Sequence, residues 1–391
     1  MKKLIFLFII LLLITNFVFS ADFGILADQK IEADSDIFSY TPSLAPWFSW
    51  TGNNLSLYFS GLLSFKYNYN YTDGGLWREP LLLPEITRFA FSYGNRGFFI
   101  EAGRIAYNDM LTLTASGFFD GIFIKTGVST KISAGIFYTG FQYKETAKIV
   151  MTDDDIKNYI KPFSIDNIND YFASKRLLAA IRLDLPVGLS SNFSAEILAQ
   201  FDLNESNQHF HSQYGAVQIE FYPHSMVRIT TAAVFETMQK NNDLNAAFGA
   251  LGRIRTALPT PINDWLTFTV KFTSSSVNEA FSTFTPLTSI PIGNIFPNSA
   301  AGVTLAGMEY TARINKYIST EISFNYYMQS YDFTLAKANY FGGETWAALI
   351  FQPLEDARIT LGGGAFFHNL GNMESSDAVT WKIIAGLTLS F

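Results

Sequence analysis

The sequence contains no cysteine and few charged residues. Charged side chains make up 16% of its 391 residues, well below the roughly 25% that is usual in soluble proteins. The absence of cysteine excludes a disulfide scaffold and a cysteine-ligated zinc site. A formal net charge of −7 excludes a broad basic surface for nucleic acid. Because aromatic residues reach 16%, we expect a chain with much apolar surface, as in membrane proteins.

Catalytic and metal-binding motifs are also absent. The sequence has no G-x-S-x-G elbow, no H-E-x-x-H pair and no P-loop. Of its four histidines, His209 and His211 share one strand face, but two ligands without a third make a weak metal site. The run Asp153 to Asp155 lacks the spacing of a calcium loop. We therefore expect no enzymatic activity, no bound metal and no cofactor.

The N-terminus resembles a cleavable secretory signal. Lys2 and Lys3 precede an uncharged run, residues 4–19, and Val18 and Ser20 supply moderate and small residues before Ala21. This run is shorter than the roughly 20 residues of a transmembrane helix. We predict a signal peptide at 1–20 and a single exported domain at 21–391.

Alternation of apolar and polar residues with period two runs through the rest of the chain. Residues 266–273 place Leu, Phe and Val on one face and Thr or Lys on the other, and 55–66, 193–202 and 379–391 follow the same rule with few exceptions. Segments of about 10 residues with this pattern are typical of outer-membrane strands. A soluble antiparallel sheet also alternates, so further features are needed.

Three features favour a barrel in a membrane. Tight turns at 52–54, 94–96, 128–130, 223–225 and 315–316 alternate with long connections at 71–84, 145–175 and 275–302. Trp381 and Phe391 lie ten residues apart on one face, which at ~3.3 Å per residue and ~40° tilt matches the height of the apolar band between two aromatic girdles. The chain ends in an aromatic residue, Phe391.

The alternating segments predict eighteen strands. Their ranges are 22–31, 45–51, 55–70, 85–93, 97–106, 118–127, 131–144, 175–185, 193–203, 209–222, 226–237, 245–257, 264–274, 303–314, 317–331, 342–352, 356–368 and 378–391. An even number keeps both termini on one side of the membrane, as in single-chain bacterial barrels. Sixteen strands remain possible if the segments up to Trp50 form a plug or a periplasmic tail.

Together the strands, the turns and the terminal Phe391 resemble bacterial outer-membrane β-barrels of the porin type. The resemblance covers the mature chain, identifies no specific family and supplies no substrate. It implies an all-β, antiparallel up-and-down transmembrane barrel, surrounded by outer-membrane lipid and inserted by the barrel assembly machinery, which recognises the C-terminal strand of such proteins.

Barrel size suggests the function. Barrels of 16 to 18 strands enclose an aqueous channel. We therefore predict a channel for passive diffusion of small hydrophilic solutes in the outer membrane of a diderm bacterium. The alternative is an adhesin or structural surface barrel without an open pore. Assembly into a homo-oligomer is left open.

Strand parity assigns charged residues to the lumen, with residues 97–106 omitted because their parity is ambiguous. The inward bases are Lys66, Arg88, Lys125, Arg176, Arg182, Arg228, Arg253, Arg255, Lys271, Arg313, Arg358 and Lys382. The inward acids are Asp184, Glu196, Asp202, Glu220, Glu236, Glu309 and Glu321. This excess of five positive charges suggests a mild preference for anions. The simpler explanation is that charges avoid lipid, where they cost ~2–4 kcal/mol, and pair inside.

Two long connections differ in composition. The segment 275–302 carries one charge and several large apolar residues, among them Phe281, Phe284, Ile292 and Phe296. It is a candidate constriction loop inside the pore, although an outward contact with a neighbouring subunit or a locally packed cap is also open. The segment 145–175 is rich in Asp and Lys, and we predict a solvated surface loop with a helical turn near 156–160.

Overall fold

A computed structural model describes residues 20–71, 76–77, 81–163, 167–204, 209–240, 243–276, 281–330, 340–368 and 379–391. The predicted signal peptide at 1–20 lies outside these ranges, apart from Ser20. No helix among the described residues is long and apolar enough to cross a membrane.

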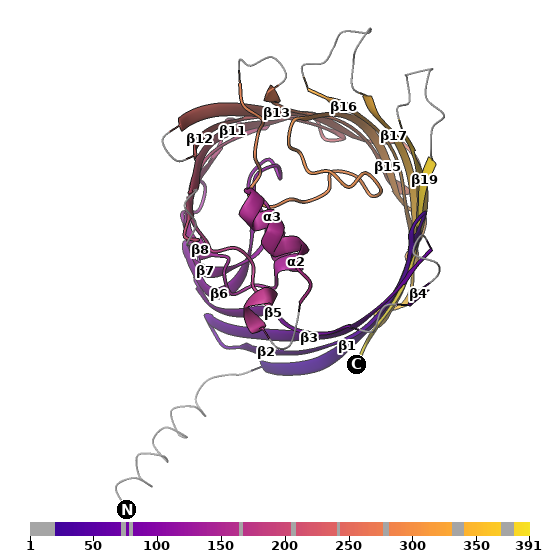
Figure 1. Cartoon of the computed structure of the whole chain (residues 1–391). Coiled ribbons are helices and arrows are strands. Elements are labelled where there is room, and N and C mark those ends of the chain that lie inside the picture. Colours follow the sequence, from indigo (N-terminus) through magenta and orange to yellow (C-terminus); the bar gives the residue numbers. More distant parts are fainter. Residues whose placement is uncertain are drawn as a thin grey trace, which may run out of the picture.

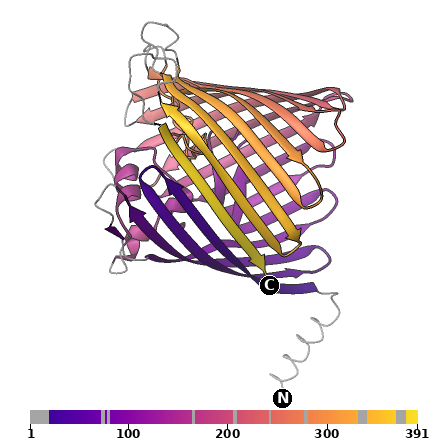
Figure 2. The same ribbon diagram turned by 90° about the vertical axis from the view of Figure 1, so that its right-hand side faces the viewer.

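Eighteen long strands form one closed antiparallel barrel (Figures 1 and 2). The first nine are β1 (Ser20–Asp34), β2 (Ile37–Thr51), β3 (Leu55–Asn70), β5 (Leu81–Gly94), β6 (Phe98–Asn108), β7 (Ser116–Thr126), β8 (Lys131–Tyr138), β9 (Arg176–Pro186) and β10 (Ser191–Asp202). The other nine are β11 (Phe210–His224), β12 (Val227–Lys240), β13 (Asp243–Ala257), β14 (Asn263–Thr273), β15 (Val303–Arg313), β16 (Ile318–Gln329), β17 (Tyr340–Leu354), β18 (Ala357–His368) and β19 (Val379–Ser390). A two-residue strand, β4 (Leu76–Trp77), pairs with the end of β3.

The first and last strands close the barrel. β1 pairs antiparallel with β19 from Leu26 to Asp34. Beyond this ladder, the backbone groups of Ile25 and Phe391 exchange two hydrogen bonds of 3.0 Å. The barrel therefore has no free first or last edge, as lipid requires.

The N-terminal strands are longer than predicted. β1 extends to Asp34 and β2 begins at Ile37, so the segments up to Trp50 belong to the wall and the count is eighteen, not sixteen. Pro42 and Pro46 interrupt the pairing of β2 with β3, which skips from Tyr40 to Ser43 and from Leu44 to Trp47. Proline has no N–H to donate to a ladder. Because the prolines interrupt the alternating pattern, the predicted strand began only at residue 45, whereas β2 begins at Ile37.

The two ends of the barrel differ. At one end, which we call the turn end, connections of two to five residues join the strands, and the start of β1 and the end of β19 lie there too (Figure 2). The opposite end, the loop end, carries the long connections, including 139–175 and 274–302. This asymmetry agrees with the predicted pattern of short and long connections.

Both of these long connections turn back into the barrel (Figure 1). The first contains α2 (Lys144–Ala147), α3 (Asp153–Ile160) and the 3-10 helix η1 (Ile168–Tyr171). The predicted helical turn near 156–160 is thus present in α3. Asp153, Asp154 and Lys157 are exposed as predicted, but the loop lies inside the barrel and not on its surface, and Asp155 is buried. β8 also ends at Tyr138, short of the predicted residue 144, because the chain leaves the wall there.

Alternation sorts the side chains as predicted. On β14, Phe268 and Val270 are 48% and 53% exposed on the outer face. On β10, Ile197 is 65% exposed outside, whereas Leu198 is 2% exposed inside. An apolar outer face and a mixed inner face are what a barrel in lipid needs.

Deletion of Leu387–Phe391 should abolish folding. It removes the partners of Ala27 and Gln29 on β1 and leaves backbone groups unpaired in lipid, at several kcal/mol each. The measurement is the heat-modifiable band of folded protein on unboiled gels. Phe391→Tyr keeps the backbone bonds and the aromatic ring, so it should fold normally. A normal folded band after the deletion would contradict the closure argument.

Arginine at neighbouring positions of β14 should act in opposite ways. Thr269→Arg places the charge in the lumen and should fold, whereas Val270→Arg places it on the lipid face and should cost ~2–4 kcal/mol near the midplane. Folding in liposomes under a urea gradient measures both. Equal losses of folding free energy would show that the faces are misassigned.

Candidate functional site

Three connections of the loop end meet inside the barrel: 109–115, 139–175 and 274–302. We call them the inward loops. Ile149 forms an antiparallel bridge with Thr288, and the backbone N–H of Leu287 donates to the carbonyl of Thr114 at 2.8 Å. Phe284 and Leu287 are completely buried in a hydrophobic cluster that these loops share with the inner wall. The loops thus form one packed body.

A buried ion pair joins the loop 139–175 to the wall. Arg176, the first residue of β9, is 0% exposed and lies 2.5 Å from Asp155 of α3 and 3.0 Å from Asp202 of β10. Asp155 also completes a capping box at the start of α3 with Thr152. Removing one member of a buried pair typically costs ~3–5 kcal/mol. The pair therefore fixes α3 inside the lumen.

Glutamates of the wall hold the loops by accepting backbone N–H groups. Glu344 of β17 accepts from three consecutive amides, Asn294 at 2.9 Å, Ile295 at 3.0 Å and Phe296 at 2.8 Å. Glu236 of β12 accepts from Thr285 at 2.9 Å. Both glutamates are 0% exposed. Hydrogen bonds to charged groups contribute ~1.5–3 kcal/mol, so the three amides bound by Glu344 make it a strong anchor.

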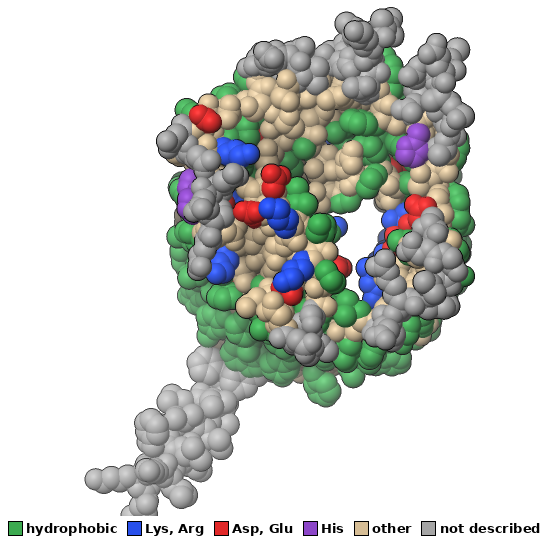
Figure 3. Space-filling view, in the orientation of Figure 1, with side chains coloured by type: hydrophobic (Ala, Val, Ile, Leu, Met, Phe, Trp, Pro, Cys, Tyr) green, Lys and Arg blue, Asp and Glu red, His purple; other side chains and the backbone are tan. Residues whose placement is uncertain are grey.

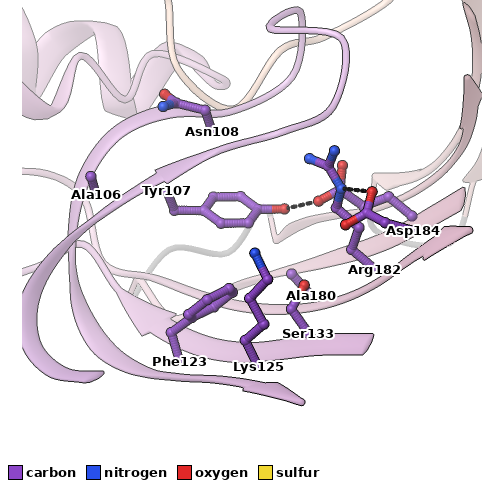
Figure 4. Close-up of a pocket in the computed structure, with 10 residues that line it drawn as sticks. Ala106, Tyr107, Asn108, Phe123, Lys125, Ser133, Ala180, Arg182 and Asp184 are labelled. Atoms are coloured by element: carbon purple, nitrogen blue, oxygen red, sulfur yellow. Dashed lines mark hydrogen bonds and ion pairs between the residues drawn. The ribbon is translucent and has the colours of Figure 1, made fainter. Parts of the chain in front are cut away.

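A third glutamate borders a cavity of about 290 Å³ beneath the loop 109–115 (Figure 4). Glu196 accepts from the Tyr107 hydroxyl at 2.6 Å and from the Met110 N–H at 2.8 Å. Arg182 on the next strand bonds Asp184 at 2.9 Å, and Lys125 reaches into the cavity from the opposite side. Arg182 and Glu196, both predicted to line the pore, thus meet at one polar site.

The connection 109–115 is organised around Asp109. Its carboxylate accepts hydrogen bonds from the backbone N–H groups of Leu111, Leu113, Thr114 and Ala115 at 2.8 to 3.4 Å. Burial raises the pKa of the Asp109 carboxyl, and the four N–H groups oppose that rise. The loop is therefore a compact turn that supports the other two inward loops.

The predicted constriction residues fall into three environments. Phe284 and Phe296 are buried, and Phe296 stacks on Tyr327 of the wall at 4.3 Å between ring centroids. Ile292 packs against the same cluster. Phe281 is 36% exposed and contacts Phe248 edge to face. Two of the four residues therefore serve to pack the loop rather than to line a passage.

A passage remains beside the inward loops. Figure 3 shows an opening through the barrel, between the loops and the part of the wall where β19 and β1 meet. Glu32 of β1 is held there by Lys30 at 2.8 Å and Lys382 at 2.5 Å. The lumen is thus narrowed but not filled, and charged side chains lie on its wall.

Four predicted pore-lining bases lie close together on β12 to β14, and we call them the basic strip. Arg228 of β12 and Arg255 of β13 are direct cross-strand partners. Between β13 and β14, Arg253 lies opposite Thr269, and Lys271 lies opposite Leu251, two residues further along each strand. Arg228 pairs with Glu220. Within the described ranges, Arg253, Arg255 and Lys271 have no carboxylate within 4.0 Å. Arg255 lies 4.5 Å from the Trp265 ring.

The remaining predicted pore-lining bases are placed differently. Arg88 pairs with Glu101 at 3.2 Å and lies over the Tyr58 ring. Arg313 ends β15, and Arg358 is the second residue of β18, so both lie near the turn end. They are apart from the basic strip.

The lumen contains more acids than the sequence predicted. Over the described strands, the register adds three inward bases, Lys30, Lys131 and Lys240, and eight inward acids: Asp22, Asp28, Glu32, Asp34, Glu85, Glu101, Asp243 and Glu344. These cancel the predicted excess of five positive charges, which was therefore wrong. Four of the acids lie on β1, whose alternation is short. Glu85 faces inward because a bulge at Thr87 shifts the parity of β5.

Nothing in the described ranges forms a metal centre. No group of three His, Asp or Glu side chains there converges on a common point. His209 and His211 stack with centroids 6.0 Å apart, and the Asp202 N–H donates to His211 Nδ1 at 3.1 Å.

Comparison with known proteins identifies the class of fold. No family model and no curated protein matches the sequence. Among solved structures, the chain is similar to the outer membrane protein OpdK of Pseudomonas aeruginosa, with a TM-score of 0.60 and 9% identity over 95% of this chain and 99% of that one. It is also similar to OccK5 (OpdH) of the same organism, with a TM-score of 0.60, 7% identity and coverage of 95% and 98%.

A third similar structure is OccAB4 of Acinetobacter baumannii, with a TM-score of 0.55, 11% identity and coverage of 95% and 98%. These similarities extend over nearly the whole of both chains. The fold is that of porin-type outer-membrane β-barrels, as the sequence predicted.

Glu344→Gln should loosen the tip of the loop 274–302. The amide keeps one acceptor oxygen but turns an NH₂ group toward backbone N–H donors, so at least one charge-assisted bond of ~1.5–3 kcal/mol is lost. Single-channel recording should show a larger and noisier conductance. Glu309→Gln removes the same charge from the inner wall of β15 and serves as the control. Identical currents in both variants would contradict the anchoring role.

Proposed function

We propose that this protein is an outer-membrane channel for passive diffusion of small hydrophilic solutes. The observation that carries the proposal is the passage left beside the inward loops in a closed barrel of eighteen strands (Figure 3). Barrels of this size enclose water, and loops folded inside them narrow the pore. The similarity to porin structures supports the same reading.

The proposal also covers the export of the chain, its insertion into the outer membrane and its orientation there. Residues 1–20 direct export and are cleaved, and the barrel assembly machinery inserts the chain through its C-terminal strand. The turn end then faces the periplasm and the loop end faces outward, as in bacterial barrels. The exposed apolar residues of the outer wall contact outer-membrane lipid. No catalytic step is part of this function.

Selectivity is proposed to come from local placement rather than from total charge. Inward charges balance, but the basic strip leaves Arg253, Arg255 and Lys271 without a carboxylate within 4.0 Å in the described part of the chain. Charges that line a pore set its ion preference. We therefore propose a mild preference for anions. One of the similar structures is described as OpdK with vanillate, a ligand reported for that protein.

Planar-bilayer recording under a salt gradient tests both the conduction of ions and the preference for anions. The channel should conduct, with a reversal potential on the anion side at low salt. Replacing Arg253 and Arg255 by Ser should move the reversal potential toward cations at low salt. The effect should fade as the Debye length falls from ~30 Å at 0.01 M to ~3 Å at 1 M.

A control variant separates local from total charge. Arg96→Ser with Lys316→Ser removes two positive charges from short connections at the turn end, and it should leave the reversal potential unchanged. An unchanged reversal potential in the strip variant, or a cation-selective wild type, would rule out the anion preference. Absence of conductance in folded wild-type protein would favour the surface-display barrel instead.

A further inference from the structure

The cavity of about 290 Å³ beneath the loop 109–115 is built on one row of cross-strand partners. Lys125 of β7 lies opposite Ser133 of β8. Ser133 lies opposite Arg182 of β9, and Arg182 lies opposite Glu196 of β10. Four neighbouring strands therefore present one row of polar side chains to the lumen. We call the cavity at this row the polar hollow.

The next inward row is apolar. There Phe123 lies opposite Gly135, and Gly135 lies opposite Ala180. Phe123 and Ala180 line the polar hollow, and the ring of Tyr107 from β6 borders it as well (Figure 4). A solute in the polar hollow would therefore meet polar groups together with aromatic rings.

The charges at the polar hollow cancel. Lys125 and Arg182 carry two positive charges, and Asp184 and Glu196 carry two negative charges. A solute with a net charge gains little Coulomb energy from charges that are already balanced at close range. The polar hollow thus differs from the basic strip and favours neither anions nor cations.

Several groups at the polar hollow keep hydrogen-bonding capacity. Arg182 bonds Asp184 through Nε at 2.9 Å, which leaves its two Nη groups available. Asp184 accepts from Arg182 and from the Ser194 hydroxyl through Oδ1, which leaves Oδ2 available. Within the described ranges, Lys125 has no carboxylate within 4.0 Å. The side chains of Arg182 and Asp184 are 32% and 31% exposed, so the lumen reaches them.

The frame of the polar hollow is preformed. Glu196 is only 4% exposed, and it accepts from the Tyr107 hydroxyl at 2.6 Å and from the Met110 N–H at 2.8 Å. These bonds hold Tyr107 and the loop 109–115 against the wall. A solute can therefore bind without any movement of the inward loops, which keeps the cost of binding low.

We propose that the polar hollow binds one neutral sugar ring, such as a hexose, on its way through the channel. Sugar hydroxyls both donate and accept hydrogen bonds, which matches the available groups of Arg182, Lys125 and Asp184. The apolar C–H face of the ring packs on an aromatic side chain. A cavity of about 290 Å³ lies at the small end of ligand sites and suits a single ring. The inference rests on the proposed channel function, because the sugar reaches the polar hollow through the lumen.

Titration with D-glucose, followed by saturation-transfer NMR on the folded full-length protein in detergent, tests the site. Lys125→Met with Asp184→Asn removes one donor and one acceptor without changing the net charge. The dissociation constant for glucose should rise at least roughly tenfold. Lys125→Met alone loses no ion pair of the described structure, so it should fold normally and still weaken binding. Wild-type affinity in both variants, or no saturable signal in the natural protein, would overturn the proposal.

A matched control removes an ion pair from another part of the lumen. Lys66 and Glu145 lie 3.9 Å apart at a different cavity, and Lys66→Met with Glu145→Gln again leaves the net charge unchanged. This variant should bind glucose as the natural protein does. Gluconate, which combines similar hydroxyls with a negative charge, should bind more weakly than glucose. Equal or tighter binding of gluconate would identify an anion site and refute the assignment to a neutral sugar.

Planar-bilayer recording separates this inference from the channel function. The variant at Lys125 and Asp184 should keep the conductance and the reversal potential of the natural protein, because its net charge and the basic strip are unchanged. Conductance without glucose binding would overturn the sugar site and leave the channel supported. Glucose binding without conductance would support the site and count against the channel.

Discussion

Hydrogen bonding of the backbone in lipid is the constraint on which the rest of this structure depends. It explains why β1 must meet β19 and why the Phe391 backbone pairs with Ile25. It also explains how interruptions are handled. Proline occupies β2 where pairing with β3 lapses. Residues 81–88 of β5 have no partner on β6, and there the Tyr171 hydroxyl and the Arg104 guanidinium donate to the carbonyls of Pro84 and Ile86. A barrel can tolerate a gap only where donors are removed or side chains satisfy the acceptors.

The same rule governs the inward loops. Loops inside a barrel bury backbone N–H groups away from water, and each unsatisfied group is costly. Carboxylates of the wall and of the loops satisfy many of these groups: Glu344 accepts three amides, Asp109 accepts four, and Glu236 and Glu196 accept one each. Three of these acids, Glu196, Glu236 and Glu344, are wall residues that strand parity directs inward. Packing of Phe284 and Phe296 adds apolar burial to this polar framework.

Sequence periodicity predicted the architecture well because the signal is local: each strand must show lipid one apolar face. It failed where geometry is not local. The bulge at Thr87 reverses the parity that would have assigned Glu85, and Pro42 and Pro46 broke the pattern of β2. The loop 139–175 is placed by a buried contact between Asp155 and Arg176. Period-two alternation within a strand carries no information about a contact between a loop residue and a strand residue. No composition rule distinguishes an aspartate in solvent from one that caps a helix inside a lumen.

These placements change how the charges of the lumen should be read. A simple count treats every inward charge as facing the solute, and by that count the lumen is balanced. Three of the counted acids, however, have oxygens directed at backbone amides or at Arg176 and are screened from the passage by burial: Asp202, Glu236 and Glu344. Three bases of the strip, Arg253, Arg255 and Lys271, have no carboxylate within 4.0 Å among the described residues, whereas Arg228 pairs with Glu220. The field that a solute meets therefore depends on which charges stay unengaged, and a neutral lumen can still discriminate between ions.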